Sequence, residues 1–284
     1  MWRSILQSGF CVGLISAAVP AVAGACGASE DGCAIEGGAY YMSAPDEPAR
    51  GIAVFLHGAG GSGKKSSANK GLASRFTDRG LAIVFPDGQP FSPDSRGLDW
   101  GVADDIPSDR DDVVFLSAVI DDATKELGLT DPPVLITGFS RGGSMAWDFA
   151  CAAPEKITAI AAVAGAFWEP MVETCDAPVH IHHTHGFADR MVPFEGRQGV
   201  FKGFAFHQGN VLKGIDVWRE VNGCVGRADD VATEGALWTK VWSTCDAGSI
   251  TLNVGPGGHG IPKGWSASVL DWFQGLAFEE PVAK

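Results

Sequence analysis

A serine framed by glycines, Gly138-Phe139-Ser140-Arg141-Gly142, constrains the fold of this 284-residue chain more than any other feature. The apolar, β-branched run 133–137 before it predicts a buried strand, and residues 143–150 after it are compatible with a helix. This spacing between a strand and a helix is the nucleophile-elbow pattern, in which the chain turns too sharply for side chains beside the serine. The turn would expose the Ser140 hydroxyl and aim the Arg141 N–H at the space where an oxyanion forms. The alternative interpretation is a Ser/Gly turn without chemistry.

A carboxylate that could orient a catalytic base follows a second predicted strand. A serine nucleophile needs a base and an acid, and elbow-bearing sheets supply them in the chain order Ser, Asp/Glu, His. Residues 177–185 predict a strand, and Asp189 lies on the loop just past its end. Its nearest rivals are Asp176, before the strand, and Glu195, past the loop. We therefore predict Asp189 as the acid; the alternative is an aspartate that only stabilises a turn.

A histidine on a glycine-rich loop could supply the base. Residues 249–254 predict another short strand, and His259 follows it between Gly258 and Gly260. This loop offers no apolar neighbour against which an imidazole would pack. We therefore predict His259 as the base rather than a surface histidine without a role.

The loop after residues 52–56, a predicted buried strand, could supply a second oxyanion donor. Glycines allow its backbone to approach a substrate closely, and we expect the Ala59 N–H to be the donor, with Gly60 as the neighbouring option. We expect His57 to brace this loop. Residues 58–64 also fit a phosphate-binding G-x-x-x-x-G-K motif, but Lys65 stands where Ser or Thr is needed to hold magnesium. A nucleotide site is therefore disfavoured, and we predict no cofactor.

Other chemistry-bearing residues are more ambiguous. Trp100 follows a polar loop and either lines a substrate pocket or joins the core. The side chains of Arg141 and Arg190 are possible substrate anchors, although surface or supporting ion pairs are the more common role. Four histidines look like a zinc-binding strand, but alternation along a strand puts them on two faces, so we predict no metal site: His180, His182, His183 and His185.

The order of the predicted elements indicates the fold class. Strands at 52–56, 80–88, 133–137 and 158–164 alternate with helices, among them one at 111–127. Such alternation predicts an α/β fold with a mostly parallel, doubly wound sheet and helices on both faces, which binds ligands at the carboxyl ends of its strands. The candidate nucleophile, acid, base and oxyanion loop all fall at such ends. Their concurrence is the strongest sequence argument for an enzyme.

Short motifs along the chain carry a family resemblance. They are Leu56-His57-Gly58, Trp100 ahead of Asp111–Leu116, Gly138–Gly143, Ala162–Gly165, His185-Gly186 followed by Asp189 and Val192-Pro193, Asn222-Gly223-Cys224 and Gly257–Gly260. From about residue 38 to about residue 273 the chain resembles the secreted α/β-hydrolase esterases grouped as polyhydroxybutyrate depolymerase-like or feruloyl esterase-like proteins. The resemblance implies Ser140 as nucleophile, Asp189 as acid and His259 as base. Arg141, where Asn is more usual, and Ile261, where Trp is commoner, depart from the family pattern.

The resemblance implies a serine esterase whose substrate is a hydroxyalkanoate oligomer or polyester, or a feruloyl or acetyl ester of a plant polysaccharide. A prolyl-oligopeptidase-like peptidase would share the fold and the three residues, but it needs an anchor for a peptide terminus. A binding protein that retains the three residues without activity is the remaining class.

The amino terminus predicts export. Residues 1–23 combine Arg3, an apolar stretch at 10–19 and Ala21-Val22-Ala23, which together form a secretory signal with its cleavage site. A disordered apolar segment is the alternative, and the sequence around Cys26 faintly resembles a lipoprotein signal. We expect residues 24–284 to form a single catalytic domain in a secreted or periplasmic monomer without a membrane span.

Cysteine number and charge agree with export. Of seven cysteines, Cys11 leaves with the signal, and six in an oxidising compartment favour disulfides. Six cysteines allow 15 pairings. Pairs that close local loops are our prediction: Cys26–Cys33, Cys151–Cys175 and Cys224–Cys245. The formal net charge of −13 argues against binding to nucleic acid or anionic membranes.

Overall fold

The computed structural model describes residues 32–90, 95, 97–102, 108–201 and 204–278. The predicted signal (1–23) and Cys26 lie outside the described residues. One large sheet organises the rest, and the parallel strands at its centre are β3 (Gly51–Leu56), β4 (Leu81–Pro86), β7 (Val134–Phe139), β8 (Ala159–Val163), β9 (His180–Gly186) and β14 (Ser249–Gly255). The strands at its two edges are antiparallel: β1 (Cys33–Ile35) and β2 (Gly38–Ser43) at one, β12 (Asp230–Glu234) and β13 (Leu237–Trp242) at the other.

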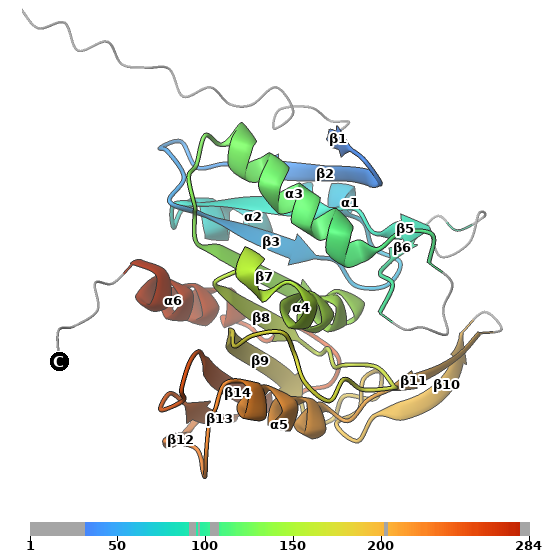
Figure 1. Ribbon diagram of the computed structural model, residues 1–284, viewed down its shortest axis with the longest axis vertical. Helices are drawn as coiled ribbons and strands as arrows, with labels where there is room; N and C mark the ends of the chain where they lie inside the picture. Colours follow the sequence, from blue (N-terminus) through green and yellow to red (C-terminus); the bar gives the residue numbers. More distant parts are fainter. Residues whose placement is uncertain (1–31, 91–94, 96, 103–107, 202–203, 279–284) are drawn as a thin grey trace, which may run out of the picture.

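The strand order within the described residues is β1-β2-β4-β3-β7-β8-β9-β14-β13-β12. Helices cover both faces of this sheet (Figure 1). They are α1 (Gly63–Ser67), α2 (Lys70–Thr77), α3 (Asp112–Glu126), α4 (Arg141–Ala152), α5 (Val211–Val221) and α6 (Trp265–Phe278), and a 3₁₀ turn, η1, spans Pro154–Lys156. The predicted α/β class with a mostly parallel sheet is confirmed.

Side-chain alternation explains the two layers of helices. In β3, Ile52, Val54 and Leu56 join the core beneath α3, α4 and α5, whereas Ala53 and Phe55 join the core shared with α2 and α6. Every residue of β3 is buried, as expected for a parallel strand covered on both faces. The carboxyl ends of the parallel strands therefore form the edge at which loops are free to build a site.

Several elements have no counterpart in the sequence prediction. Two short strands, β5 (Gln89–Pro90) and β6 (Leu98–Asp99), pair beside the glycine-rich loop. A hairpin of β10 (Arg197–Phe201) and β11 (Phe204–Gln208) projects beyond the carboxyl ends of the central strands (Figure 1). The β12–β13 hairpin widens the sheet. β5 and β6 are two residues long, too short for a periodic pattern to reveal them.

Two disulfides are present in the described part of the chain. Cys151 at the end of α4 bonds Cys175, and Cys224 after α5 bonds Cys245 after β13, as the sequence predicted. The third predicted pair depends on Cys26, outside the described residues; Cys33 is buried in β1. Among the described residues, no helix is both long and apolar enough to cross a bilayer.

Candidate active site

Ser140 occupies a turn that only glycine neighbours permit. It lies between the end of β7 and the start of α4 with φ 59° and ψ −121°, a strained conformation for a residue with a side chain. A Cβ on Gly138 would overlap the Gly142 carbonyl, and a Cβ on Gly142 would overlap the carbonyl of Leu56 at the end of β3. The two glycines of the motif therefore let the turn close and let it pack against the neighbouring strand.

His259 and Asp189 lie in line with this serine. The His259 Nε2 is 2.8 Å from the Ser140 Oγ, and the His259 Nδ1 is 2.7 Å from the Asp189 Oδ2. Because a carboxylate only accepts, Nδ1 carries the proton, and the Nε2 lone pair faces the hydroxyl. The Asp189 side chain is fully buried and that of His259 is 18% exposed. The structure thus brings the three predicted residues together, although they lie up to 119 positions apart.

Backbone donors fix the Asp189 carboxylate. Its Oδ1 accepts the N–H groups of Met191 and Val192 at 2.8 and 2.9 Å. His185 fixes the same turn from below, because its Nε2 lies 2.7 Å from the Val192 carbonyl, which can only accept. With Nε2 protonated, a neutral His185 accepts at Nδ1, so the His183 Nε2 at 3.0 Å donates to it. The His185-Gly186 motif in the sequence does not by itself reveal this supporting role.

The loops that carry Asp189 and His259 are joined through their backbones. The Phe187 N–H donates to the Gly255 carbonyl at 2.6 Å, and the Ala188 N–H donates to the Gly257 carbonyl at 3.0 Å. A Cβ on Gly186 would overlap the Gly257 carbonyl, so glycine is needed for this approach. The acid and base loops therefore form one unit at the ends of β9 and β14.

The histidines of β9 alternate between the two faces of the sheet, as predicted. The His182 ring lies 5.1 Å from the Trp272 ring of α6, and the His183 ring lies 5.0 Å from the Trp147 ring of α4. Burial lowers the pKa of His182 to about 4 and lowers the pKa of His183 and His185. They are neutral at ordinary pH. Within the described ranges no group of three His, Cys, Asp or Glu residues is placed to hold a metal ion.

The glycine-rich loop after β3 carries the Ala59 N–H, the first of the two predicted oxyanion donors. The Gly58 carbonyl accepts from the Gly61 N–H and from the His57 Nδ1–H, each at 2.9 Å. In a trans peptide the N–H points opposite to the carbonyl, so the Ala59 N–H points away from these bonds. Within the described ranges Ala59 N–H has no protein acceptor, whereas the Gly60 N–H donates to the Leu98 carbonyl at 2.8 Å. Ala59 rather than Gly60 is therefore the available donor.

The Arg141 N–H is the second available donor. It belongs to the first residue of α4, where an N–H has no acceptor within the helix. The loop and the elbow are close together, since a Cβ built on Gly58 would lie 3.4 Å from the Ser140 Cβ. Two backbone N–H groups that have no acceptor among the described residues thus belong to segments that meet near Ser140. Such an arrangement can stabilise a negatively charged tetrahedral oxygen.

The sequence profile of one family, described as phospholipase/carboxylesterase, matches residues 39–204, more than half of the chain. The chain belongs to the phospholipase/carboxylesterase family. Among curated relatives, the putative esterase NocK of Nocardia uniformis subsp. tsuyamanensis is 32% identical over 168 residues, which cover 56% of this chain and 47% of the relative. Feruloyl esterase C of Emericella nidulans is 27% identical over 134 residues and 46% of each chain. The chain thus spans about half the length of these relatives.

Two esterases of known structure share the fold. Acetyl xylan esterase from Aspergillus awamori superimposes with a TM-score of 0.62 at 16% identity, over 84% of this chain and 94% of that one. The Bacillus cereus carboxylesterase superimposes with a TM-score of 0.57 at 14% identity, over the same shares. These likenesses establish the α/β-hydrolase fold for this member of the phospholipase/carboxylesterase family.

In this family member Trp100 takes the second of its two expected places and joins the core. Trp100 is only 2% exposed, and its indole N–H donates to the His57 carbonyl at 2.8 Å, so it braces the glycine-rich loop instead of offering a surface to substrate. His57 also braces this loop, because its Nε2 accepts the Gly88 N–H at 3.1 Å. Gly60 borders open space but donates its N–H within the protein. Arg190 is exposed.

The Arg141 side chain is buried beside Asp99. Its Nε lies 3.0 Å from the Asp99 Oδ1, and its Nη2 lies 3.2 Å from the Asp99 Oδ2. Burial raises the pKa of the Asp99 carboxyl and lowers the pKa of Arg141, in opposition to their mutual attraction. Nothing in the sequence pattern pointed to Asp99, which lies 42 positions before Arg141.

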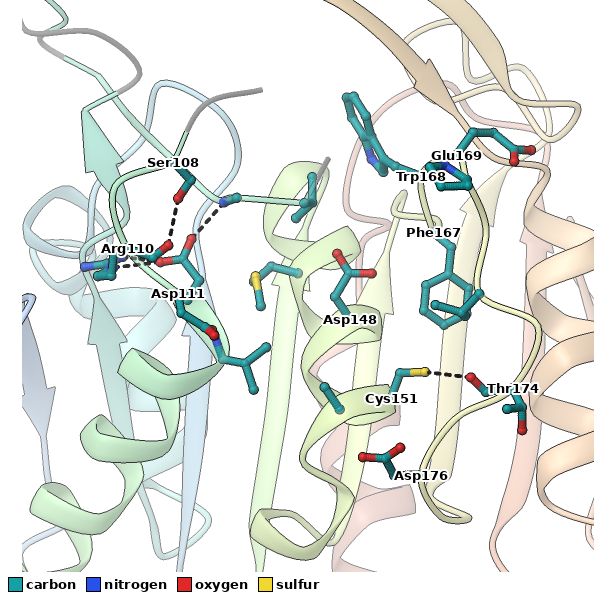
Figure 2. Close-up of a pocket in the computed structure, with 18 of the residues that line it drawn as sticks. Ser108, Arg110, Asp111, Asp148, Cys151, Phe167, Trp168, Glu169, Thr174 and Asp176 are labelled. Atoms are coloured by element: carbon teal, nitrogen blue, oxygen red, sulfur yellow. Dashed lines mark hydrogen bonds and ion pairs between the residues drawn. The ribbon is translucent and has the colours of Figure 1, made fainter. Parts of the chain in front are cut away.

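A pocket of about 930 Å³ lies to one side of the three aligned residues. Figure 2 shows that its walls come from α3, α4 and the segment after β8, with Asp148 and Trp168 facing the space between them. Neither Ser140 nor His259 lines it. Carboxylates dominate its charged lining: Asp109, Asp111, Asp112, Asp148, Glu169 and Asp176. This pocket is therefore a poor receptor for anions and is separate from the aligned residues.

Proposed function

We propose that this chain is a serine esterase that hydrolyses carboxylic esters through an acyl-enzyme. The observation that carries the proposal is the continuous line from the Ser140 Oγ through His259 to the buried Asp189, at 2.8 and 2.7 Å. Membership of the phospholipase/carboxylesterase family supports the same reaction class.

In the proposed reaction the Ser140 oxygen attacks the ester carbonyl while the His259 Nε2 takes its proton. Asp189 keeps the proton of Nδ1 in place and stabilises the imidazolium that forms. The carbonyl oxygen becomes an oxyanion that accepts from the Ala59 and Arg141 N–H groups. His259 then protonates the leaving alcohol as the carbon–oxygen bond breaks.

Water completes the proposed cycle. His259 removes a proton from a water molecule, which attacks the acyl carbon, and the collapse of the second tetrahedral intermediate returns the proton to Ser140. Only hydroxyl, imidazole, carboxylate and backbone groups take part in these steps. EDTA should therefore leave the rate unchanged.

The proposed substrates are a hydroxyalkanoate oligomer or polyester, or feruloyl or acetyl esters of plant polysaccharide. The names of two relatives, a feruloyl esterase and an acetyl xylan esterase, support the second class. We further propose that residues 1–23 form a secretory signal, that residues 24–284 form a single catalytic domain, and that the mature protein is an exported monomer. The two disulfides support an oxidising compartment.

The decisive experiment compares hydrolysis of short-chain p-nitrophenyl esters with hydrolysis of peptide p-nitroanilides. We expect ester turnover that a serine-directed inhibitor abolishes, with the inhibitor bound at Ser140. Ser140→Ala should lower kcat by roughly 10³-fold or more with little change in stability. Turnover of the anilides alone would favour the peptidase alternative, and turnover of neither would favour a binding protein.

The acid is tested by a matched pair of substitutions. Asp189→Asn should cost far more activity than Asp176→Asn, because Asp189 bonds His259 whereas Asp176 lines the separate acidic pocket. Equal losses of kcat from the two variants would show that a residue other than Asp189 is the acid. Once esterase activity is established, a panel of feruloyl, acetyl and hydroxyalkanoate esters would identify the substrate.

A further inference from the structure

The guanidinium of Arg141 is held in a single orientation. Two parallel bonds to Asp99 fix its plane, and its Cζ lies 4.1 Å from the centre of the Trp168 ring, which covers one face. Both members of the pair are almost completely buried, with side-chain exposures of 7% and 9%. Because two hydrogen bonds and a ring contact act together, the Arg141 side chain has little freedom to rotate.

Asp99 lies in the middle of the segment that holds the glycine-rich loop. On one side of it, the Leu98 carbonyl accepts the Gly60 N–H at 2.8 Å. On its other side, the Trp100 indole N–H donates to the His57 carbonyl at 2.8 Å. The two neighbours of Asp99 therefore hold the loop both before and after Ala59, while the Asp99 carboxylate holds Arg141.

The structure leads us to an inference that rests on the proposed esterase function. We propose that the Asp99–Arg141 pair is a positioning device that sets the spacing between the two oxyanion donors, the N–H groups of Ala59 and Arg141. These donors follow different strands, β3 and β7, and no hydrogen bond between the two N–H groups could fix their separation. The pair joins them through side chains that are anchored on both sides of the site.

A positioning role explains why a charged pair is buried here. Removing two charges from water carries a desolvation cost, and a buried ion pair often adds little net stability. The Asp99 Oδ1 also accepts the Trp100 N–H at 2.9 Å, whereas the Arg141 Nη1 is buried without a partner in the described residues. The pair therefore leaves one guanidinium nitrogen without a hydrogen bond to any described residue. Its geometry instead fixes the orientation of the Arg141 side chain, and a fixed orientation is what preorganised oxyanion donors require.

The first arm of the test measures ester turnover in Asp99→Asn, which keeps the size of the side chain, and in Arg141→Lys, which keeps its charge. Both variants lose the two parallel hydrogen bonds between guanidinium and carboxylate. We expect kcat to fall about 10- to 100-fold in each, with KM changed less than about threefold, because misplaced donors affect the transition state more than substrate binding. A boronic acid that forms a tetrahedral adduct on Ser140 should lose affinity by the same factor as kcat/KM. Wild-type kcat in folded Asp99→Asn, or unchanged boronate affinity, would overturn the proposal.

Two controls separate positioning from stability. Arg110→Lys makes the same exchange in a pair of similar burial, in which the Arg110 Nη2 is 2.6 Å from the Asp112 Oδ1. It should lower the melting temperature and leave kcat unchanged. The double variant Asp99→Leu/Arg141→Met replaces the charges with apolar groups and should recover much of the stability lost by Asp99→Asn without recovering turnover. Recovery of wild-type kcat in the double variant would overturn the proposal.

A second arm is independent of catalysis. Amide hydrogen exchange at Gly60, whose N–H bonds the Leu98 carbonyl, should accelerate at least about tenfold in Arg141→Lys relative to wild type and to Arg110→Lys. If wild-type protein hydrolyses no ester, the proposed function fails, and the exchange measurement still decides whether the pair holds the loop. Unchanged exchange at Gly60 in both Arg141→Lys and Asp99→Asn would overturn the positioning role.

Discussion

The two sides of the candidate site are held by different kinds of contact. Neutral groups fix the acid and base loops, because backbone hydrogen bonds join them and His185 supports the turn at Asp189. On the nucleophile side, glycines close the elbow and a buried ion pair, Asp99–Arg141, joins it to the loop after β3. The difference predicts that backbone hydrogen bonds keep the two loops of the first side together, whereas the position of the second side depends on one ion pair.

Adding a side chain that obstructs the tight turn at Ser140 should have the largest effect on turnover. In Gly142→Ala the new Cβ would overlap the Leu56 carbonyl, so α4 must move away from the end of β3 and displace both Ser140 and the Arg141 N–H. We expect kcat for ester hydrolysis to fall about 10³-fold or more, together with a lower melting temperature. Gly71→Ala in α2 is the matched control, because the nearest atom to its new Cβ is the Asn69 Oδ1 at 3.6 Å. This variant should keep wild-type kcat, with an unchanged or slightly higher melting temperature. An active Gly142→Ala would contradict the steric argument.

Removing His185, the neutral side chain that supports the turn at Asp189, should lower turnover less. His185→Leu deletes the bond to the Val192 carbonyl, and the loosened turn should lower kcat about 10- to 100-fold. His185→Gln retains an N–H donor and should recover most of this loss. His180→Gln, on the same strand but bonded to Ser249, should retain wild-type kcat. Equal losses in the Leu and Gln variants would show that packing, rather than the hydrogen bond, supports Asp189.

The two sides of the site also differ in how much of them could be predicted from the sequence. Ser140, Asp189 and His259 were predictable because each follows a predicted strand in the expected chain order, and Ser140 and His259 are flanked by glycines. The central strands were predictable because most of them are short apolar runs. The Asp99–Arg141 pair was not, because β6 is two residues long and carries no periodic signal. Trp100 was ambiguous in sequence, since an indole serves equally well in a pocket wall or as a buried donor.

Acidification should also lower the stability of the acid and base side, through a buried histidine of β9. Burial lowers the pKa of His182 from 6.5 to about 4, so between these values the unfolded chain binds more protons than the folded protein. Stability therefore rises with pH through this window and is lost as pH falls from about 6.5 toward 4, by about 3 kcal/mol for this residue. The melting temperature, measured from pH 7.5 to 4, should fall less steeply in His182→Gln. An identical slope in the variant would contradict the burial argument.

Breaking the disulfides should have the smallest effect on turnover. Cys224→Ser/Cys245→Ser should reduce the free energy of unfolding by about 2–5 kcal/mol, yet leave kcat at low temperature near wild type, because the acid and base loops are joined by their own backbone bonds. Cys151→Ser/Cys175→Ser provides the comparison at the end of α4, on the nucleophile side. Thermal unfolding and low-temperature kinetics measure the two effects separately. Loss of kcat with full stability would contradict this separation.

Two backbone hydrogen bonds hold the acid and base loops together, from the Phe187 and Ala188 N–H groups to the Gly255 and Gly257 carbonyls. They bear on how this enzyme fold could evolve or be engineered. The 69 residues between Asp189 and His259 do not themselves set the distance between acid and base, because the ends of that segment are fastened to each other. The β10–β11 and β12–β13 hairpins within it can therefore be lengthened, shortened or exchanged with little effect on the aligned residues. This segment is the natural place to graft recognition elements for a new ester while the chemistry stays intact.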